Sequence, residues 1–545
     1  MKKKFIPSDG LTGLRQNFSA DALSGFLVFL LALPLSLGIA SASDFPPIYG
    51  LITAMIGGLL VSFFAGSLLT IKGPAAGLIV IVAGAVAELG QGNNELGWKL
   101  ALGAIVVAGV IQIVFGLLKF GSYSDFFPLS AVHGMLAAIG IIIISKQLHI
   151  LVGMNPLTHE GKPMVEPIEL LIELRHTLAN FFEHREVAIV GLISLAIVFL
   201  WPMIPVKAIK KIPSALIVLC VAIPLAKFMG LHNTADVKDA AGVVVQKGFA
   251  PLLSFKDGFF DIIGIQVDFG GWQFPGPFIK YVIMFAVVGS LEALLTVKAI
   301  DMLDPYKRRS NPDKDLIAVG AGNIIAGALG GLPMISEVAR SSANVSNGAQ
   351  TRWANFFHGL FIFLFLVFAV SFSDLIPKTA LSAMLIGVGW KLAHPKEFGH
   401  MAKIGADQII IFVATILVTL ASDLLIGIAA GIFIEFALHI ARGVPVSLLF
   451  KPKMHIEGNV VKIDEAAVFS NFIPIKKKLL EFDLKGHVTV DFRKCNFIDH
   501  SVIETLHHMK DDFKAEGGEM NILGIEELKA VGNSKHPLAS VRRKK

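Results

Sequence analysis

The sequence is poor in charged residues and has almost no cysteine. Charged side chains make up 17% of its 545 residues, whereas soluble domains usually carry about 25%. Its two cysteines, Cys220 and Cys495, cannot form the disulfide framework of a small secreted domain. Apolar residues make up 54% of the chain, and the mean hydropathy is +0.68. These values exclude disordered, collagen-like and disulfide-rich classes, and they indicate a membrane protein with many spans.

Apolar segments follow one another along most of the chain. A helix needs about 17–25 apolar residues to cross a bilayer. Segments of roughly this kind lie near 21–42, 48–69, 98–118, 126–148, 187–204, 212–230, 277–300, 353–371, 377–392, 406–421 and 423–441. Shorter apolar pieces interrupted by Gly and Pro lie near 73–89, 315–331 and 334–347. Together they predict an α-helical polytopic membrane protein with fourteen transmembrane segments.

The basic residues lie between these segments and indicate topology, not nucleic-acid binding. The net charge is a modest +6, with bases gathered at 207–211 after the sixth segment and at 307–309 after the eighth. Cytoplasmic loops carry an excess of Lys and Arg. Loops after even-numbered segments are therefore expected in the cytoplasm, and so are both termini. The predicted transporter domain covers 21–441 and follows a cytoplasmic N-terminal segment, 1–20.

The composition changes after about Arg442. Strands are predicted at His455–Ile463, His487–Phe492 and Glu519–Leu523, and an amphipathic helix at Ser501–Lys514. This order predicts a small cytoplasmic α/β domain over 452–530. A basic tail, 531–545, follows, and its last residues, Val541–Lys545, are expected to be solvated, with weak attraction to anionic lipid as the alternative.

Two segments are too short and too rich in Gly and Pro to be ordinary spans. One contains Lys72-Gly73-Pro74-Ala75-Ala76-Gly77, and the other contains Gly330-Gly331-Leu332-Pro333-Met334-Ile335-Ser336-Glu337. Paired interrupted segments in the two halves of a transporter point to its binding site. Each half-helix would begin inside the membrane, where its N–H groups and positive dipole end suit an anion. The alternative is a pair of Gly-rich packing helices. The residues predicted to bind the anion are Gly73, Pro74, Ala75, Ala76, Pro333, Ser336, Glu337 and Arg340.

Ionisable residues inside apolar segments are functional candidates, because each costs about 2.5–3.5 kcal/mol on insertion scales. Glu292 lies in the middle of the eighth segment, and Thr296 follows one turn later on the same helix face. A carboxylate and a hydroxyl so placed offer oxygen ligands to Na⁺, or the carboxylate accepts a proton. A structural pairing of Glu292 with another helix is the alternative.

Four further charged or titratable side chains are each open to two interpretations. Glu337 and Arg340 are three residues apart, so they form an intrahelical ion pair, or Arg340 adds positive potential to the anion site while Glu337 titrates. Lys72 strengthens the anion site, or it neutralises Glu292 or Glu337. His133, near the start of the fifth segment, is expected to be packed or interfacial, with a proton relay as the alternative.

These stretches resemble the sulfate permease (SulP) family of anion transporters, which is related to solute carrier family 26. The resemblance covers nearly the whole chain. It is carried by Leu33-Pro34-Leu35-Ser36-Leu37-Gly38-Ile39-Ala40-Ser41, Lys72-Gly73-Pro74, Gly289 to Asp301, Asn323, Gly330-Gly331-Leu332-Pro333, Ala339-Arg340-Ser341 and Asn344. The C-terminal region resembles a STAS domain around Val490-Asp491-Phe492 and Ile498-Asp499-His500-Ser501.

The resemblance implies a seven-plus-seven inverted repeat, about 21–230 and 277–441, with UraA-like core and gate domains. It further implies a homodimer in the inner (plasma) membrane of a bacterium, with a cytoplasmic partner for the STAS-like domain. Family members that transport bicarbonate bind Na⁺ through positions that correspond to Glu292 and Thr296, and a basic residue of the tenth helix falls on Arg340. Lys72 and Glu337 depart from the family pattern, so the charge of the site differs from that of relatives.

The predicted function is secondary active transport of a small inorganic anion by alternating access, coupled to Na⁺ or H⁺. Two acids near the site, Glu292 and Glu337, disfavour a dianion unless one is protonated, so the prediction leans slightly to bicarbonate over sulfate. An uncoupled anion channel or exchanger has the same fold, and a nucleobase–cation symporter is less favoured by the motifs. No enzyme and no cofactor is expected, because the spans contain no nucleophile–base or metal constellation. On the C-terminal helix, His500, Glu504 and His508 share a face without an apparent fourth metal ligand.

Overall fold

The computed structural model describes residues 6–121, 127–154, 164, 167–179, 184–206, 212–233, 237–238, 244–246, 251–253 and 259–543. The basic cluster predicted to mark a cytoplasmic loop at 207–211 lies outside this part of the chain. The protein consists of two compact units. The first contains residues 1–121 and 140–391, and the second contains residues 122–139 and 392–545.

The fourteen predicted segments all contain helices. Those of the first half are α1 (Gly10–Ala42), α2 (Ile48–Ile56) continued by a π-turn and α3 (Ser62–Phe64), α4 (Ile79–Gly90), α5 (Asn94–Leu117), α6 (Leu129–Leu151), α8 (Arg185–Leu200) and α9 (Ser214–Phe228). Those of the second half are α11 (Pro275–Leu303), α12 (Pro312–Ala328), α13 (Val338–Ser346), α14 (Trp353–Phe368), α15 (Lys378–Leu392), α17 (Ala406–Ala421) and α18 (Leu424–Ala441). The predicted polytopic helical fold is confirmed. Helices α7 (Pro167–Ala179), α10 (Phe259–Ile262) and α16 (Pro395–Ile404) were not predicted.

The third and tenth segments each begin with a strand instead of a helix. Strand β1 (Ile71–Pro74) precedes a 3₁₀ turn and α4, and strand β4 (Met334–Glu337) leads directly into α13. The two strands pair antiparallel, with Ile71 opposite Glu337 and Pro74 opposite Met334. The pairing joins the interrupted segments of the two halves.

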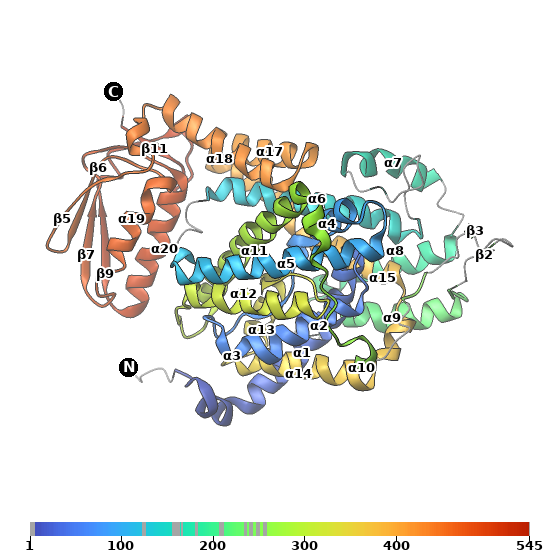
Figure 1. Ribbon diagram of the computed structural model, residues 1–545. Helices are drawn as coiled ribbons and strands as arrows, with labels where there is room; N and C mark the ends of the chain where they lie inside the picture. The colour runs from blue at the N-terminus through green and yellow to red at the C-terminus, as the bar shows by residue number, and fades with distance from the viewer. Residues whose placement is uncertain are drawn as a thin grey trace. The chain divides into compact units, whose positions relative to one another are not determined.

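Small residues bring the helices of the first unit close together around these strands. Helices α5 and α12 run side by side (Figure 1). Gly109 and Gly320 face each other there, and a Cβ on Gly109 would lie 2.7 Å from the Gly320 carbonyl oxygen. Such close backbone approach is how membrane helices pack where no hydrophobic effect drives them together.

Helix starts follow from local capping residues. The Asn93 side chain accepts the N–H groups of Glu95 and Leu96 at the start of α5. At the start of α12, Asn311 accepts the N–H of Lys314 at 2.9 Å, and Pro312 occupies the first helical position. Both arrangements satisfy N–H groups that have no partner within the helix.

The C-terminal α/β domain has more elements than predicted. Its strands are β5 (Lys453–Glu457), β6 (Val460–Ala467), β7 (His487–Asp491), β8 (Cys495–Ile498), β9 (Glu519–Leu523), β10 (Lys529–Ala530) and β11 (Val541–Arg542), and its helices are α19 (Phe469–Leu479) and α20 (His500–Glu516). The strands form one sheet in the order β10-β11-β8-β6-β7-β9, with β5 paired to β6. Apolar side chains of both helices and the sheet form its core, including Phe472, Val490, Leu506 and Phe513.

Two predictions for this domain were wrong. The run His455–Ile463 is not one strand, because a turn at Gly458, with φ +56°, divides it into the hairpin β5–β6. The basic tail is not wholly solvated, because Val541 and Arg542 pair with Ile498 and Phe497 of β8. The sequence alternation could not show this, since two residues are too few for a pattern.

Candidate functional site

Side chains from three helices complete the hydrogen bonds of the β1–β4 pair. In a membrane interior an unpaired backbone group costs several kcal/mol, so non-helical backbone persists only where protein surrounds it. Asn323 of α12 accepts the Met334 N–H and donates to the Met334 carbonyl. Ser341 of α13 accepts the Ile71 N–H at 2.8 Å, and Asn355 of α14 accepts the Lys72 N–H at 3.4 Å. The strands are thereby fixed inside the first unit.

The two half-helices differ at their N-termini. No side chain caps the 3₁₀ turn Ala76–Leu78 or α4 behind it. Helix α13 is capped by Glu337, whose Oε2 accepts the Arg340 N–H at 2.8 Å. The sequence analysis expected both N-termini to face an anion. The Glu337 carboxylate already occupies the N-terminus of α13, whereas the N-terminus of α4 carries no side-chain cap.

Arg340 is a buried cation without a hydrogen bond. Its side chain is fully buried, and none of its three guanidinium nitrogens has a hydrogen-bond partner among the described residues. It lies against β1, since a Cβ on Gly73 would be 2.5 Å from Nη1. The Glu337 carboxylate accepts the backbone N–H of Arg340 and forms no hydrogen bond with its guanidinium, so the intrahelical ion pair, one of the two interpretations from the sequence, is not formed in that way. The guanidinium is left with five N–H donors, which match the oxygens of an oxyanion.

Glu292 lies beside the start of the other half-helix. It projects from α11 toward Gly77, where an added Cβ would overlap both carboxylate oxygens. Glu292 is buried, and its Oε1 and the nearby Ser290 hydroxyl have no hydrogen-bond partner among the described residues. Thr296 is buried one turn further along the same helix. An unpartnered carboxylate with hydroxyls on the same helix can hold a proton or a hard cation such as Na⁺.

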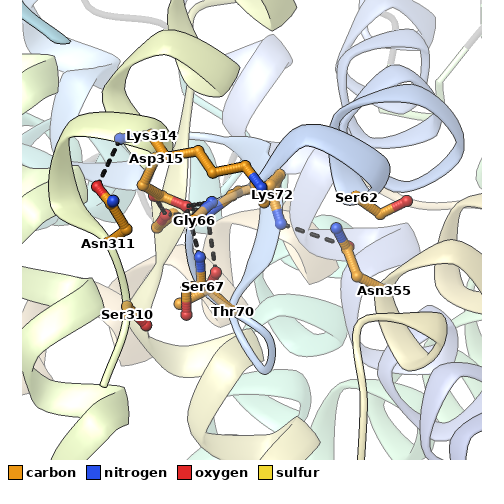
Figure 2. Close-up of polar contacts among 12 residues, drawn as sticks. Ser62, Gly66, Ser67, Thr70, Lys72, Ser310, Asn311, Lys314, Asp315 and Asn355 are labelled. Atoms are coloured by element: carbon orange, nitrogen blue, oxygen red, sulfur yellow. Dashed lines mark hydrogen bonds and ion pairs between the residues drawn. The ribbon is translucent and has the colours of Figure 1, made fainter. Parts of the chain in front are cut away.

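Lys72 belongs to a different cluster from the one expected. Its Nζ lies 2.8 Å from both carboxylate oxygens of Asp315 and also donates to Thr70 and Ser336 (Figure 2). Asp315 in turn accepts the N–H groups of Gly66 and Ser67. Lys72 therefore neutralises Asp315 of α12 and not Glu292 or Glu337. Asp315 was not singled out from the sequence, because it lies in the first turn of α12 beside the charged residues Asp313 and Lys314.

The other predicted residues occupy separate places. Ala75 donates its N–H to the Pro333 carbonyl at 3.3 Å, which joins the two half-segments beside Gly73, Pro74 and Ala76. The Ser336 hydroxyl donates to Asp315 at 3.0 Å, so this predicted anion ligand is part of the Lys72 cluster. His133 belongs to the second unit, where its Nδ1 lies 3.6 Å from Glu397.

His358 is a candidate that the sequence analysis missed. It lies in α14, is fully buried, and neither ring nitrogen has a hydrogen-bond partner among the described residues. The signal was available, because a histidine within the apolar run Trp353–Phe368 meets the same criterion that selected Glu292.

Comparison with known proteins assigns the family. The sequence profile described as "Sulfate permease family" matches residues 18–415. The chain belongs to the sulfate permease family. A Bacillus subtilis (strain 168) member named "Putative sulfate transporter YvdB" is 26% identical over 523 residues, which are 94% of this chain and 92% of the relative.

Solved structures of similar fold agree with this assignment. The transmembrane domain of a cyanobacterial bicarbonate transporter, BicA, superposes with a TM-score of 0.63 and 21% identity, covering 76% of this chain and 98% of that one. The overall structure of SLC26A9 gives a TM-score of 0.65 and 14% identity, covering 94% of this chain and 85% of that one. At these identities the likeness shows the fold. This sulfate permease family member is thus a transmembrane protein with the predicted inverted-repeat architecture.

Proposed function

We propose that this sulfate permease family member is a secondary active transporter that carries a small inorganic oxyanion by alternating access. The observation that carries the proposal is Arg340, a fully buried guanidinium without a hydrogen-bond partner among the described residues. Burying a charge without a partner is costly, and a bound anion offsets that cost. The uncapped start of α4 lies in the same chain segment as Gly73, which contacts Arg340. Its N–H groups add a second set of donors for the anion.

The charges favour bicarbonate over sulfate as the substrate. Arg340 supplies one positive charge, while Glu337 holds a negative charge at the start of α13 and Glu292 adds another when ionised. A monoanion joins this set with less repulsion than a dianion does. Sulfate becomes favourable only when Glu292 is neutralised by a proton or a cation.

Glu292 and Thr296 are proposed to bind the coupling ion. Both are buried on α11, and Glu292 lies against Gly77 at the start of α4, so an ion held there is close to the proposed anion site. Neutralising Glu292 lowers the repulsion that an incoming anion meets. Binding of each ion thus favours binding of the other, as symport requires.

The test is uptake of labelled bicarbonate and labelled sulfate into proteoliposomes with a Na⁺ gradient, an H⁺ gradient or neither. Accumulation of bicarbonate that requires Na⁺ is the expected result. Accumulation of sulfate that requires an H⁺ gradient would still be secondary active transport, but it would overturn bicarbonate as the proposed substrate. Anion flux at channel rates without dependence on either cation would overturn secondary active transport itself.

A further inference from the structure

A buried cluster of three donor atoms lies within the second unit, away from the proposed anion site in sequence. Glu435 and His439 are one turn apart on α18, and Asp499 precedes α20. His439 Nε2 lies 3.7 Å from Glu435 Oε1 and 3.7 Å from Asp499 Oδ2, and the three donor atoms all lie within 4.8 Å of one another. None of the three residues is more than 1% exposed.

Several polar atoms of the cluster have no hydrogen-bond partner among the described residues. Neither carboxylate oxygen of Glu435 has a hydrogen-bond partner among the described residues, and the same is true of His439 Nδ1. The neighbouring Arg442 donates to Asp407 at 2.8 Å, so this cation serves another carboxylate. Two carboxylates buried together without a compensating cation are strongly unfavourable. A cation bound between the three side chains would compensate the two buried carboxylates.

The distances suit a shared ion better than direct hydrogen bonds. At 3.7 Å, neither contact of the imidazole is within hydrogen-bonding range. Donors about 2.0–2.2 Å from a tetrahedral metal ion lie about 3.4 Å apart, which a small side-chain adjustment reaches. An imidazole with two carboxylates is a donor set for Zn²⁺ and similar first-row divalent ions, and two ionised carboxylates balance the charge of such an ion.

The surroundings orient the donors and place aromatic rings beside them. Asp499 accepts the N–H groups of Val502 and Phe469, which fix its carboxylate and leave it lone pairs for a further ligand. The rings of Phe469 and Phe497 lie 5.8 and 5.3 Å from the His439 ring. Metal sites in proteins are tuned by this kind of outer support.

We propose that Glu435, His439 and Asp499 form a binding site for a divalent transition-metal ion of the Zn²⁺ class, which ties helix α18 to the N-terminus of α20. The three protein ligands leave one tetrahedral position for a water molecule. The set differs from His500, Glu504 and His508 of α20, for which the sequence analysis found no fourth metal ligand. The side chains of His500 and His508 lie 3.3 and 3.8 Å from the Glu504 carboxylate.

The test uses full-length, tag-free protein in detergent, stripped of metal by a chelator and dialysed. Zn²⁺ is titrated in competition with a chromophoric chelator, and the melting temperature is measured with and without Zn²⁺. We expect one equivalent of Zn²⁺ per chain and a higher melting temperature with the ion. Replacing Zn²⁺ by Co²⁺ gives a visible spectrum that reports a tetrahedral site with nitrogen and oxygen ligands.

Variants separate this site from adventitious binding. Glu435→Gln and Asp499→Asn preserve side-chain shape, and Asn still caps α20. Each is expected to lower Zn²⁺ affinity more than about tenfold and to remove the Co²⁺ spectrum, while the metal-free protein elutes as the wild type does. His508→Gln removes a histidine from the other His–Glu pair and is expected to change neither. Failure of the wild type to bind Zn²⁺, or equal affinity in Glu435→Gln, Asp499→Asn and wild type, would overturn the proposal.

Discussion

Two kinds of buried charge occur among the residues of the first unit. Lys72 and Asp315 form a closed pair, in which every charge has a partner. Arg340 and Glu292 each keep polar atoms without a hydrogen bond among the described residues. Removing one member of a closed buried pair leaves the other charge buried without compensation. A buried charge that has no protein partner is instead a candidate for binding a ligand. The two kinds are therefore expected to respond differently to substitution.

Arg340→Ala is expected to weaken anion binding. A hydrogen bond to a charged group contributes about 1.5–3 kcal/mol, so the KM for the anion should rise about 10- to 150-fold. The KM for the coupling cation should change much less. Initial uptake rates in proteoliposomes, measured over a range of anion and cation concentrations, check this. A larger effect on the cation would make Arg340 a structural residue.

Glu292→Gln is expected to abolish uptake against a gradient. The amide keeps the size of the side chain but neither gains a proton nor carries the charge that Na⁺ needs. The purified variant should elute and melt as the wild type does. Cation-driven accumulation at the wild-type level in this variant would remove Glu292 from the coupling mechanism.

Lys72→Met is expected to act on stability. It leaves the Asp315 carboxylate buried without its cation, at a cost of about 3–5 kcal/mol. The double variant Lys72→Met/Asp315→Leu removes both charges and should recover most of that loss. Melting temperatures in detergent check the comparison. If the double variant melted no higher than the single one, Asp315 would be needed for its bonds to the N–H groups of Gly66 and Ser67 and not only as the partner of Lys72.

Two glycines of the first unit differ in which atoms an added methyl group would meet. Gly77 approaches the end of a flexible side chain, Glu292, whereas Gly58 of the π-turn approaches the backbone of Gly359 in α14. A side chain can move aside, but two packed backbones cannot separate without loss of the helix contact. The same glycine-to-alanine change is thus expected to have opposite consequences at the two positions.

Gly77→Ala is expected to displace the Glu292 carboxylate and impair transport, with a melting temperature close to that of the wild type. Gly58→Ala is expected to lower the melting temperature, because its Cβ overlaps the Gly359 backbone. Paired measurements of melting and of uptake distinguish the two. Normal transport in Gly77→Ala would show that Glu292 does not need its place beside α4.

The sequence predicted the positions of the helices and half-helices better than it predicted the contacts between their side chains. Apolar runs fix the spans, and the Gly–Pro interruptions located both half-helices. The partner of Lys72 could not be predicted, because Asp315 is 243 positions away in the chain. The cap by Glu337 was missed because three-residue spacing to Arg340 suggests an ion pair as readily as a backbone bond. Such choices depend on which side chains the tertiary fold brings together.

For the whole molecule, the orientation in the membrane is a prediction from loop charge. The even count of segments places both termini on the same side of the membrane, and the basic loop 307–309 after the eighth segment predicts that this side is the cytoplasm. Gly264 precedes α11, and Gly399 lies in α16 after α15. Five segments, the eighth to the twelfth, separate these two positions, so they must lie on opposite sides of the membrane.

Single cysteines at the two glycines test this orientation, in a background in which Cys220 and Cys495 are replaced by serine. An added Cβ meets nothing within 4 Å at either glycine, so both substitutions should fold. Gly264→Cys is expected to react with a membrane-impermeant maleimide in intact cells, and Gly399→Cys only after the membrane is permeabilised. Labelling of both from outside would mean an even number of crossings between them. One of the short segments would then not cross the bilayer, and the pairing of the third with the tenth segment across an inverted repeat would no longer hold.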